Sequence, residues 1–180
     1  MAKTFAQLVT AFEAHTGISG EIDNATLAIW FNDAQEDLAM DFGRIKTVEV
    51  VVGEPFLLPE DCIKVIDVEQ GGTPLLWDVS PDRYITIAAN GAVKLLYRSM
   101  PGVAFSGSDG LQTSDLSPVL HRLIPIYAAY MYWMRESEGD SEEYRLGNSW
   151  WEKYMLGKQQ ALQKLQETTA RIPDCWLIAD

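Results

Sequence analysis

Histidines are the side chains best suited to acid–base or metal chemistry, and this 180-residue chain has two of them. His15 lies at the end of one predicted helix and His121 in the first turn of another. Neither has a second His or Cys three or four residues away that could share a metal ion. We therefore expect each to be an ordinary surface or half-buried imidazole. One enzyme hypothesis stays open, in which His121 and Asp115 act beside a long loop with a cofactor that the sequence does not reveal.

The remaining nucleophiles and glycine clusters also lack a catalytic arrangement. Cys62 follows Glu60 and Asp61, whose negative charge raises the pKa of a thiol and so weakens it as a nucleophile. We expect Cys62 to pack in a strand, and both Cys62 and Cys175 to be reduced. The glycines match neither the phosphate-binding loop nor the dinucleotide-binding turn. The sequence therefore predicts no catalytic, cofactor-binding or metal-binding residues and indicates that the protein is not an enzyme.

Acidic residues outnumber basic ones by 26 to 14, which gives a net charge of −12 and an isoelectric point near 4.5. The excess is spread along the chain, with −5 in residues 1–44, −3 in 45–105 and −4 in 106–180. A groove that binds nucleic-acid phosphates needs clustered Lys and Arg, so this class of protein is disfavoured. The longest apolar run, Leu123 to Met134, is about half the length that spans a bilayer. We expect a soluble protein made in a cytoplasm, with no membrane partner.

Apolar periodicity predicts two helices in the first quarter of the chain. Apolar residues recur at helical spacing from Phe5 to Phe12. Asp23 is a suitable N-cap for a second helix, and Gly43 lies where a C-terminal residue of positive φ is wanted. The polar face of this second helix, which includes Asn32, is acidic and expected to be solvated.

Between residues 45 and 99 the pattern changes to β-branched residues punctuated by Gly and Pro, which is typical of strands. Gly71-Gly72 is expected to turn one strand into the next, and Asn90-Gly91 is expected to close a two-residue hairpin. The predicted strands are Val48 to Val52, Ile63 to Glu69, Pro74 to Val79, Tyr84 to Ala89 and Ala92 to Arg98.

Helical spacing returns after a Gly- and Ser-rich segment, residues 99–117, that is expected to be a long surface loop. Ser117-Pro118 predicts a helix start, and Pro125 must kink this helix or divide it. Asp140 with Glu143 predicts a capping box for a last helix that reaches about residue 170. The core stripe of this last helix is expected to be Tyr144, Trp151, Met155, Leu162 and Leu165.

These elements predict an α+β fold that is mainly helical. It would be an antiparallel helical bundle with a small inserted antiparallel β lobe and an extended C-terminal tail. Residues 1–44 would supply the N-terminal helices and residues 45–105 the β lobe. Residues 106–172 would supply the loop and a C-terminal helical hairpin, and residues 173–180 a docking tail.

The last two helices carry apolar and aromatic residues on more sides than one core requires. Tyr130 and Trp133 extend the apolar stripe of the first of these helices onto a second side, and Trp150 points about 100° away from Trp151. Either the β lobe or the N-terminal helices cover Trp150, or a neighbouring subunit does. Because Trp and Tyr are enriched at interface hot spots, Trp150, Trp133 and Tyr130 are our candidates for a subunit interface.

Several short motifs follow one another along the chain. The run Phe56-Leu57-Leu58-Pro59-Glu60-Asp61-Cys62 opens the β lobe, and Leu95-Leu96-Tyr97-Arg98 ends its last strand. Pro125-Ile126-Tyr127-Ala128-Ala129-Tyr130 follows in a helix, and the turn Glu138-Gly139-Asp140 leads into the last helix. In this succession, over roughly residues 23–170, the chain resembles the head-tail connector, or adaptor, proteins of tailed bacteriophages.

The resemblance implies a structural protein of the virion neck that is made in the host cytoplasm and is not an enzyme. Family members form a ring, commonly a dodecamer, that binds beneath the portal and carries the tail or the next neck protein. They hold the portal partly through C-terminal segments, so the resemblance makes the tail a portal-binding candidate through Pro173, Trp176, Leu177 and Ile178. DNA passes through the lumen of such a ring without specific binding, and an acidic lumen would favour this by like-charge repulsion.

A second hypothesis is an acidic regulatory or DNA-mimic protein that blocks a nucleic-acid-binding partner. Such a protein should array its carboxylates on one continuous face. In this sequence they are divided among all three sections of the chain.

Overall fold

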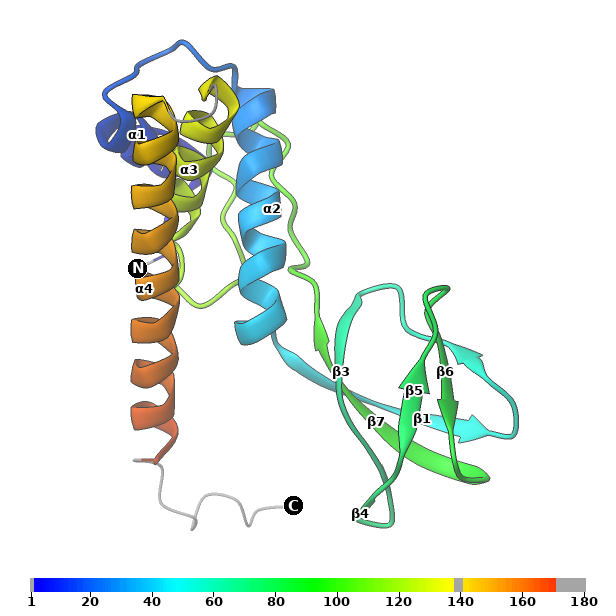
Figure 1. The fold of residues 1–180 in the computed structure, drawn as a ribbon. Coiled ribbons are helices and arrows are strands. Elements are labelled where there is room, and N and C mark those ends of the chain that lie inside the picture. Colours follow the sequence, from blue (N-terminus) through cyan, green and yellow to red (C-terminus); the bar gives the residue numbers. More distant parts are fainter. Residues whose placement is uncertain (1, 138–140, 171–180) are drawn as a thin grey trace. The chain divides into compact units, whose positions relative to one another are not determined.

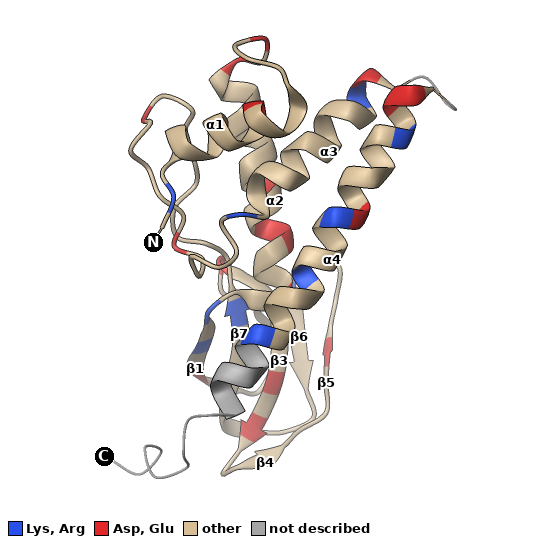
Figure 2. Ribbon diagram, turned by 90° about the vertical axis from the view of Figure 1, so that its left-hand side faces the viewer, with Lys and Arg blue, Asp and Glu red and all other residues tan. Residues whose placement is uncertain are grey.

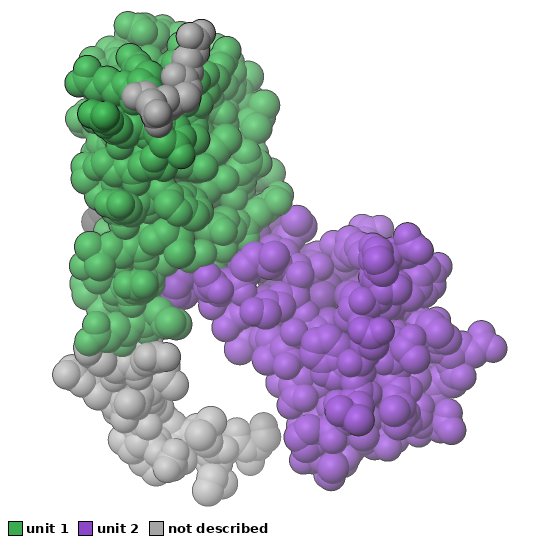
Figure 3. All heavy atoms as spheres, in the orientation of Figure 1, with its two compact units in different colours: residues 1–38, 103–180 green, residues 39–102 purple. Residues whose placement is uncertain are grey.

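The computed structural model describes residues 2–137 and 141–170, and the side chains up to residue 164 (Figure 1). The chain divides into two compact units (Figure 3). The first, here called the helical unit, comprises Met1–Leu38 and Val103–Asp180, and the second, the β unit, comprises Ala39–Gly102. Within the described residues the elements are α1 (Phe5–Thr16), α2 (Asn24–Phe42), β1 (Ile45–Val52), β2 (Phe56–Leu57), β3 (Cys62–Gln70), β4 (Thr73–Pro74), β5 (Trp77–Val79), β6 (Tyr84–Ile87), β7 (Gly91–Ser99), α3 (Ile124–Glu136) and α4 (Glu142–Ala170).

The expected fold class, a mainly helical bundle with a small β lobe, is wrong. The strands form two antiparallel sheets, one of four strands in the order β1-β7-β3-β4 and one of three in the order β2-β6-β5. The two sheets share a core of their own, so the chain is a mixed α+β protein and the β unit is more than an appendage of a bundle. The two-residue strand β2, which completes the second sheet, was not among the predicted strands. The predicted tail, residues 173–180, lies outside the described residues.

The β unit is held together by aliphatic side chains from both sheets. Val65, Val68 and Leu95 from the first sheet and Ile85 from the second are all buried in one cluster. The Gly71-Gly72 turn between β3 and β4 is confirmed, because both glycines have positive φ (59° and 82°). Each buried aliphatic side chain of this kind stabilises the fold by about 1.5–3 kcal/mol.

The hairpin predicted at Asn90-Gly91 is wrong. Strand β6 pairs with β2 and β5, whereas β7 pairs with β1 and β3, so the two strands lie in different sheets. Gly91 has a φ of +95° and stands opposite Val52 at the end of β1. The Asn-Gly pair therefore carries the chain from one sheet to the other.

The ends of α1 and α2 show how the local sequence sets the helices. Thr4 and Gln7 form a capping box at the start of α1, and Asp23 Oδ1 accepts a hydrogen bond from Thr26 N at 2.9 Å, which confirms the predicted cap of α2. The prediction for Gly43 is wrong, because this glycine does not have positive φ. It is needed for space, since a Cβ there would lie 2.6 Å from Ala39 O and 2.8 Å from Ser99 O.

Pro125 divides the helix that Ser117-Pro118 was expected to start. Residues 118–123 form turns, and α3 begins at Ile124 with Pro125 in its first turn. Helix α4 begins at Glu142, where Ser141 Oγ accepts a hydrogen bond from Tyr144 N at 3.3 Å. The predicted cap Asp140 lies outside the described residues.

Small residues let α4 approach its neighbours closely. A Cβ on Gly147 would lie 2.8 Å from Met134 Sδ, and a Cβ on Gly157 would collide with the side chain of Leu123. Together with Tyr154 these glycines form the buried face of α4. The predicted core stripe of α4 is therefore wrong at Tyr144, Met155 and Leu162, which are exposed. Its member Trp151 is half-buried, and the side chain of Leu165 lies outside the described residues.

The segment expected to be a surface loop, residues 99–117, packs into the helical unit beyond residue 102. Phe105 is buried, and its ring centroid lies 5.4 Å from that of Phe5 and 6.2 Å from that of Phe31. Asn32, expected to be solvated, holds this segment instead. Its Nδ2 donates to Phe105 O at 3.0 Å, and its Oδ1 accepts from Phe105 N at 2.8 Å.

Candidate interaction surface

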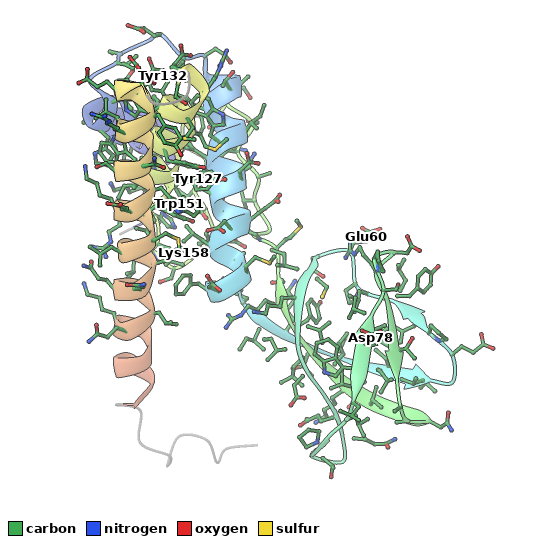
Figure 4. All side chains as sticks on the ribbon, viewed as in Figure 1. Glu60, Asp78, Tyr127, Tyr132, Trp151 and Lys158 are labelled. Carbon is green, nitrogen blue, oxygen red and sulfur yellow. The ribbon has the colours of Figure 1, made fainter. Side chains whose placement is uncertain are left out.

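Aromatic side chains join α3 to α4 in the helical unit. The ring of Tyr154 lies 5.3 Å from Tyr127 and 5.6 Å from Trp151, and Trp151 lies 5.0 Å from Tyr130. These tilted and edge-to-face arrangements are the favourable geometries for aromatic pairs. Figure 4 labels Tyr127 and Trp151 on these helices. We call these four residues the aromatic cluster.

Beside the aromatic cluster lies a charged triad that was not predicted from the sequence. The hydroxyl of Tyr154 donates a hydrogen bond to Asp37 Oδ2 at 2.5 Å, and Lys158 Nζ lies 2.9 Å from the same oxygen. The side chain of Lys158 is only 13% exposed, so its charge needs the carboxylate of Asp37 nearby. The signal in the sequence was the series Gly147, Tyr154, Gly157 and Ala161, whose spacing of seven, three and four residues marks the packed face of α4.

The hydroxyl of Tyr127 stays protonated near this triad. Burial raises the pKa of Tyr127, and the negative charges of Asp33 and Asp37 raise it further. A phenol in this setting can donate a hydrogen bond and does not act as an anion. The cluster and triad therefore form a polar and aromatic contact between α2, α3 and α4, in which no group is poised as a nucleophile.

The three interface candidates are half-buried on α3 and α4. Tyr130 packs on Trp151 in the aromatic cluster, and the ring of Trp133 lies 5.0 Å from that of Tyr132. Trp150 lies 5.1 Å from the ring of His15 on α1, and Lys153 Nζ lies 3.8 Å above it. The first helix thus covers part of Trp150, and the rest of its surface stays accessible.

His121 has both ring nitrogens bonded to the backbone. Its Nδ1 accepts a hydrogen bond from Lys3 N at 2.9 Å, and its Nε2 faces Leu116 O at 3.0 Å. Because a carbonyl only accepts, Nε2 carries the proton and the ring is neutral. Burial lowers the pKa of His121. His121 is fully buried, contrary to the expected surface or half-buried imidazole, and in this structure it joins the N-terminus to the segment before α3.

Cys62 is a buried strand residue, as predicted. Burial raises the pKa of its thiol; Arg83 opposes this shift and Asp61 adds to it. Among the described residues Cys62 has a free thiol, and Cys175 lies outside them.

The Leu-Pro-acid-acid motif that precedes Cys62 has a structural role. Arg83 Nη2 donates to Pro59 O at 2.6 Å and to Glu60 O at 3.1 Å. Asp61 accepts from Tyr97 at 3.1 Å and pairs with Lys46.

A pocket of about 340 Å³ lies at the end of the helical unit where α3 ends. Its lining residues are Glu21, Ile22, Asp23, Tyr132, Arg135 and Glu136. Burial raises the pKa of Tyr132, and Glu136 and Glu21 raise it further. Asp23 is already engaged as the cap of α2, so the pocket offers mainly Glu21 and the Arg135–Glu136 pair.

Metal sites, membrane-spanning helices and the predicted portal-binding tail are the remaining candidates. The residues that the structure describes contain no cluster of three or more His, Cys, Asp or Glu side chains able to hold a metal ion. None of the helices in that part of the chain is long and apolar enough to cross a membrane. The portal-binding candidates Pro173, Trp176, Leu177 and Ile178 lie outside the described residues.

No protein-family model matches the chain, and no curated protein matches it either.

Proposed function

We propose that this protein is a structural head-to-tail adaptor of a tailed bacteriophage. Twelve or so copies would form a ring beneath the portal, connect the capsid to the tail or the next neck protein, and let DNA pass through the lumen. The observation that carries the proposal is the order of the motifs along the chain, from the Leu-Pro-acid-acid motif through the Pro125 motif of α3 to the acidic turn before the last helix.

The described side chains support a role in binding other polypeptides. Trp150, Trp133 and Tyr130 are only half-buried although each already packs on a neighbouring ring. Further apolar side chains on α4 are exposed, among them Leu156 at 56% and Leu162 at 46%. Aromatic and apolar residues of this kind are the usual anchors of protein interfaces. The net charge of −12 suits a lumen that must not retain DNA.

Electron microscopy of the protein mixed with purified portal rings tests this proposal. We expect a second layer, coaxial with the portal, that is absent from portal rings alone. Portal rings that stay bare at saturating protein concentration would contradict it. If the protein instead displaced DNA from a DNA-binding protein, the DNA-mimic hypothesis would replace it.

Deleting residues 173–180 tests how the ring would hold the portal. We expect the shortened chain to keep its helical circular dichroism and to bind portal-bearing capsids more weakly. A chain with the same eight residues in scrambled order is the matched control, because it keeps length and charge. Unchanged binding by the shortened chain would show that the portal is held elsewhere.

A further inference from the structure

The outer face of α2 is acidic and carries an exposed apolar residue. Ile29 is 59% exposed, Glu36 is exposed, and Asp33 lies between them, four residues after Ile29 and three before Glu36. Residues at this spacing share one side of a helix. No Lys or Arg occurs anywhere in α2, as the red bands of Figure 2 illustrate. We call Ile29, Asp33 and Glu36 the α2 face.

One face of α4 has the same spacing and the opposite charge. Leu146 is 38% exposed, Trp150 follows four residues later, and the exposed Lys153 follows three residues after that. Lys153 Nζ lies 3.8 Å above the Trp150 ring, so the ammonium group is already placed beside the indole. We call Leu146, Trp150 and Lys153 the α4 face.

The first and last residues of the two faces match when the helices run parallel. Ile29 and Glu36 are seven residues apart, as are Leu146 and Lys153, which is about 10 Å along either helix. Setting Ile29 against Leu146 therefore brings Glu36 beside Lys153. Two copies of the α2 face would oppose their carboxylates, so this face suits the α4 face better than itself.

We infer that the α2 face of one copy packs on the α4 face of the next copy, with Ile29 against Leu146 and Glu36 against Lys153. The inference rests on the proposed ring. It adds the pair of helices that joins neighbouring subunits. A contact between two different faces is head-to-tail, and repeated contacts of this kind close into rings when the rotation allows. Part of the Trp150 surface left open by His15 is then covered by the neighbour.

Charge reversal tests the contact in self-association, measured by sedimentation over a range of concentrations. Glu36→Lys and Lys153→Glu should each weaken association at least about tenfold, because like charges then face each other. A 1:1 mixture of the two variants should regain association within about threefold of the wild type, since each altered face meets its altered partner. Glu54→Lys, on an exposed site of the β unit, is the matched control and should change nothing.

The sign of the first effect separates the contact from general repulsion. Glu36→Lys lowers the negative charge of each copy, so nonspecific repulsion would make association stronger, opposite to our expectation. Association that rises in this variant, or a mixture no better than either variant, would overturn the inference.

A zero-length carbodiimide cross-link gives the register directly. In a mixture of isotopically light and heavy protein, we expect a heavy-to-light link between Glu36 and Lys153. Finding no such link at the highest soluble concentration would also overturn the inference. Portal binding tests the proposed function separately from the contact. A chain that forms this contact but leaves portal rings bare contradicts the proposal that the protein is an adaptor. A portal-bound ring that is unaffected by Glu36→Lys or by Lys153→Glu contradicts the contact between the α2 face and the α4 face.

Discussion

The helical unit uses polar side chains to join its segments, whereas the β unit keeps its charged side chains at the surface. In the helical unit, Asn32 and His121 are held by backbone bonds and Asp37 joins Tyr154 to Lys158. In the β unit the core is mainly aliphatic, and the strand register sets Lys94 between Glu49 and Glu69 on neighbouring strands. Hydrogen bonds between specific polar side chains fix one arrangement of the helices, whereas an aliphatic core tolerates substitution by apolar residues of similar size.

The largest expected effect comes from removing one core side chain in each unit. Phe31→Ala should lower the free energy of unfolding of the helical unit by about 3–5 kcal/mol, and Leu95→Ala that of the β unit by about 2–5 kcal/mol, because both side chains are fully buried. Urea denaturation followed by tryptophan fluorescence measures both, since Trp77 is the one Trp of the β unit.

Leu76→Ala is the control for these substitutions. Leu76 is 85% exposed, so the change should stay within about 0.5 kcal/mol. If Phe31→Ala shifted the Trp77 transition as much as its own, the two units would unfold together and the comparison between them would fail.

A smaller effect is expected from the charged triad. Asp37→Asn leaves Lys158 without its carboxylate. It should lower the free energy of unfolding of the helical unit by about 1–2 kcal/mol in the same urea experiment. Combining it with Lys158→Met should recover part of this loss. Lys46→Met, which breaks the more exposed pair with Asp61 in the β unit, should cost less. An equal or larger loss from Lys46→Met would contradict the contrast between the units.

The smallest effect is a dependence on pH between about 7 and 5, which only the helical unit should show because both histidines lie in it. Burial lowers the pKa of His121 in the folded chain, so the unfolded chain binds the proton more readily. The free energy of unfolding should therefore be highest above the ordinary histidine pKa of about 6.5 and should decrease as the pH falls below that value. His121→Gln should reduce this slope between about pH 7 and 5 in the helical unit. A slope unchanged by the substitution would assign the effect to other groups.

Local signals predicted the ends and the types of most elements. The helix at Phe5, the Asp23 cap, the Gly71-Gly72 turn and the break at Pro125 all follow from the chemistry of a few adjacent residues. The hairpin at Asn90-Gly91 failed because the same dipeptide suits any sharp change of direction. Which sheet a strand joins depends on partners distant in the sequence.

The candidate surface was only half predictable for a related reason. The surplus of aromatic residues on α3 and α4 is visible in the sequence, but the side of α4 that packs inward is set by Gly147 and Gly157. A reading that follows large apolar residues places the core on Met155 and Leu162, which are exposed. The partner of Lys158 is Asp37, a residue 121 positions earlier, and no periodicity within one helix reveals it.

The ends of the β unit have a consequence for how this chain could change over time. Ile45, near its entry, lies opposite Arg98, near its exit, and Ser99 N donates to Arg44 O at 2.9 Å. The chain thus enters and leaves the β unit at two adjacent strand ends, so the sheets form an inserted cassette. Such a cassette could be recoded or exchanged for another of different shape while the helices keep their sequence, so the two halves are free to diversify at different speeds.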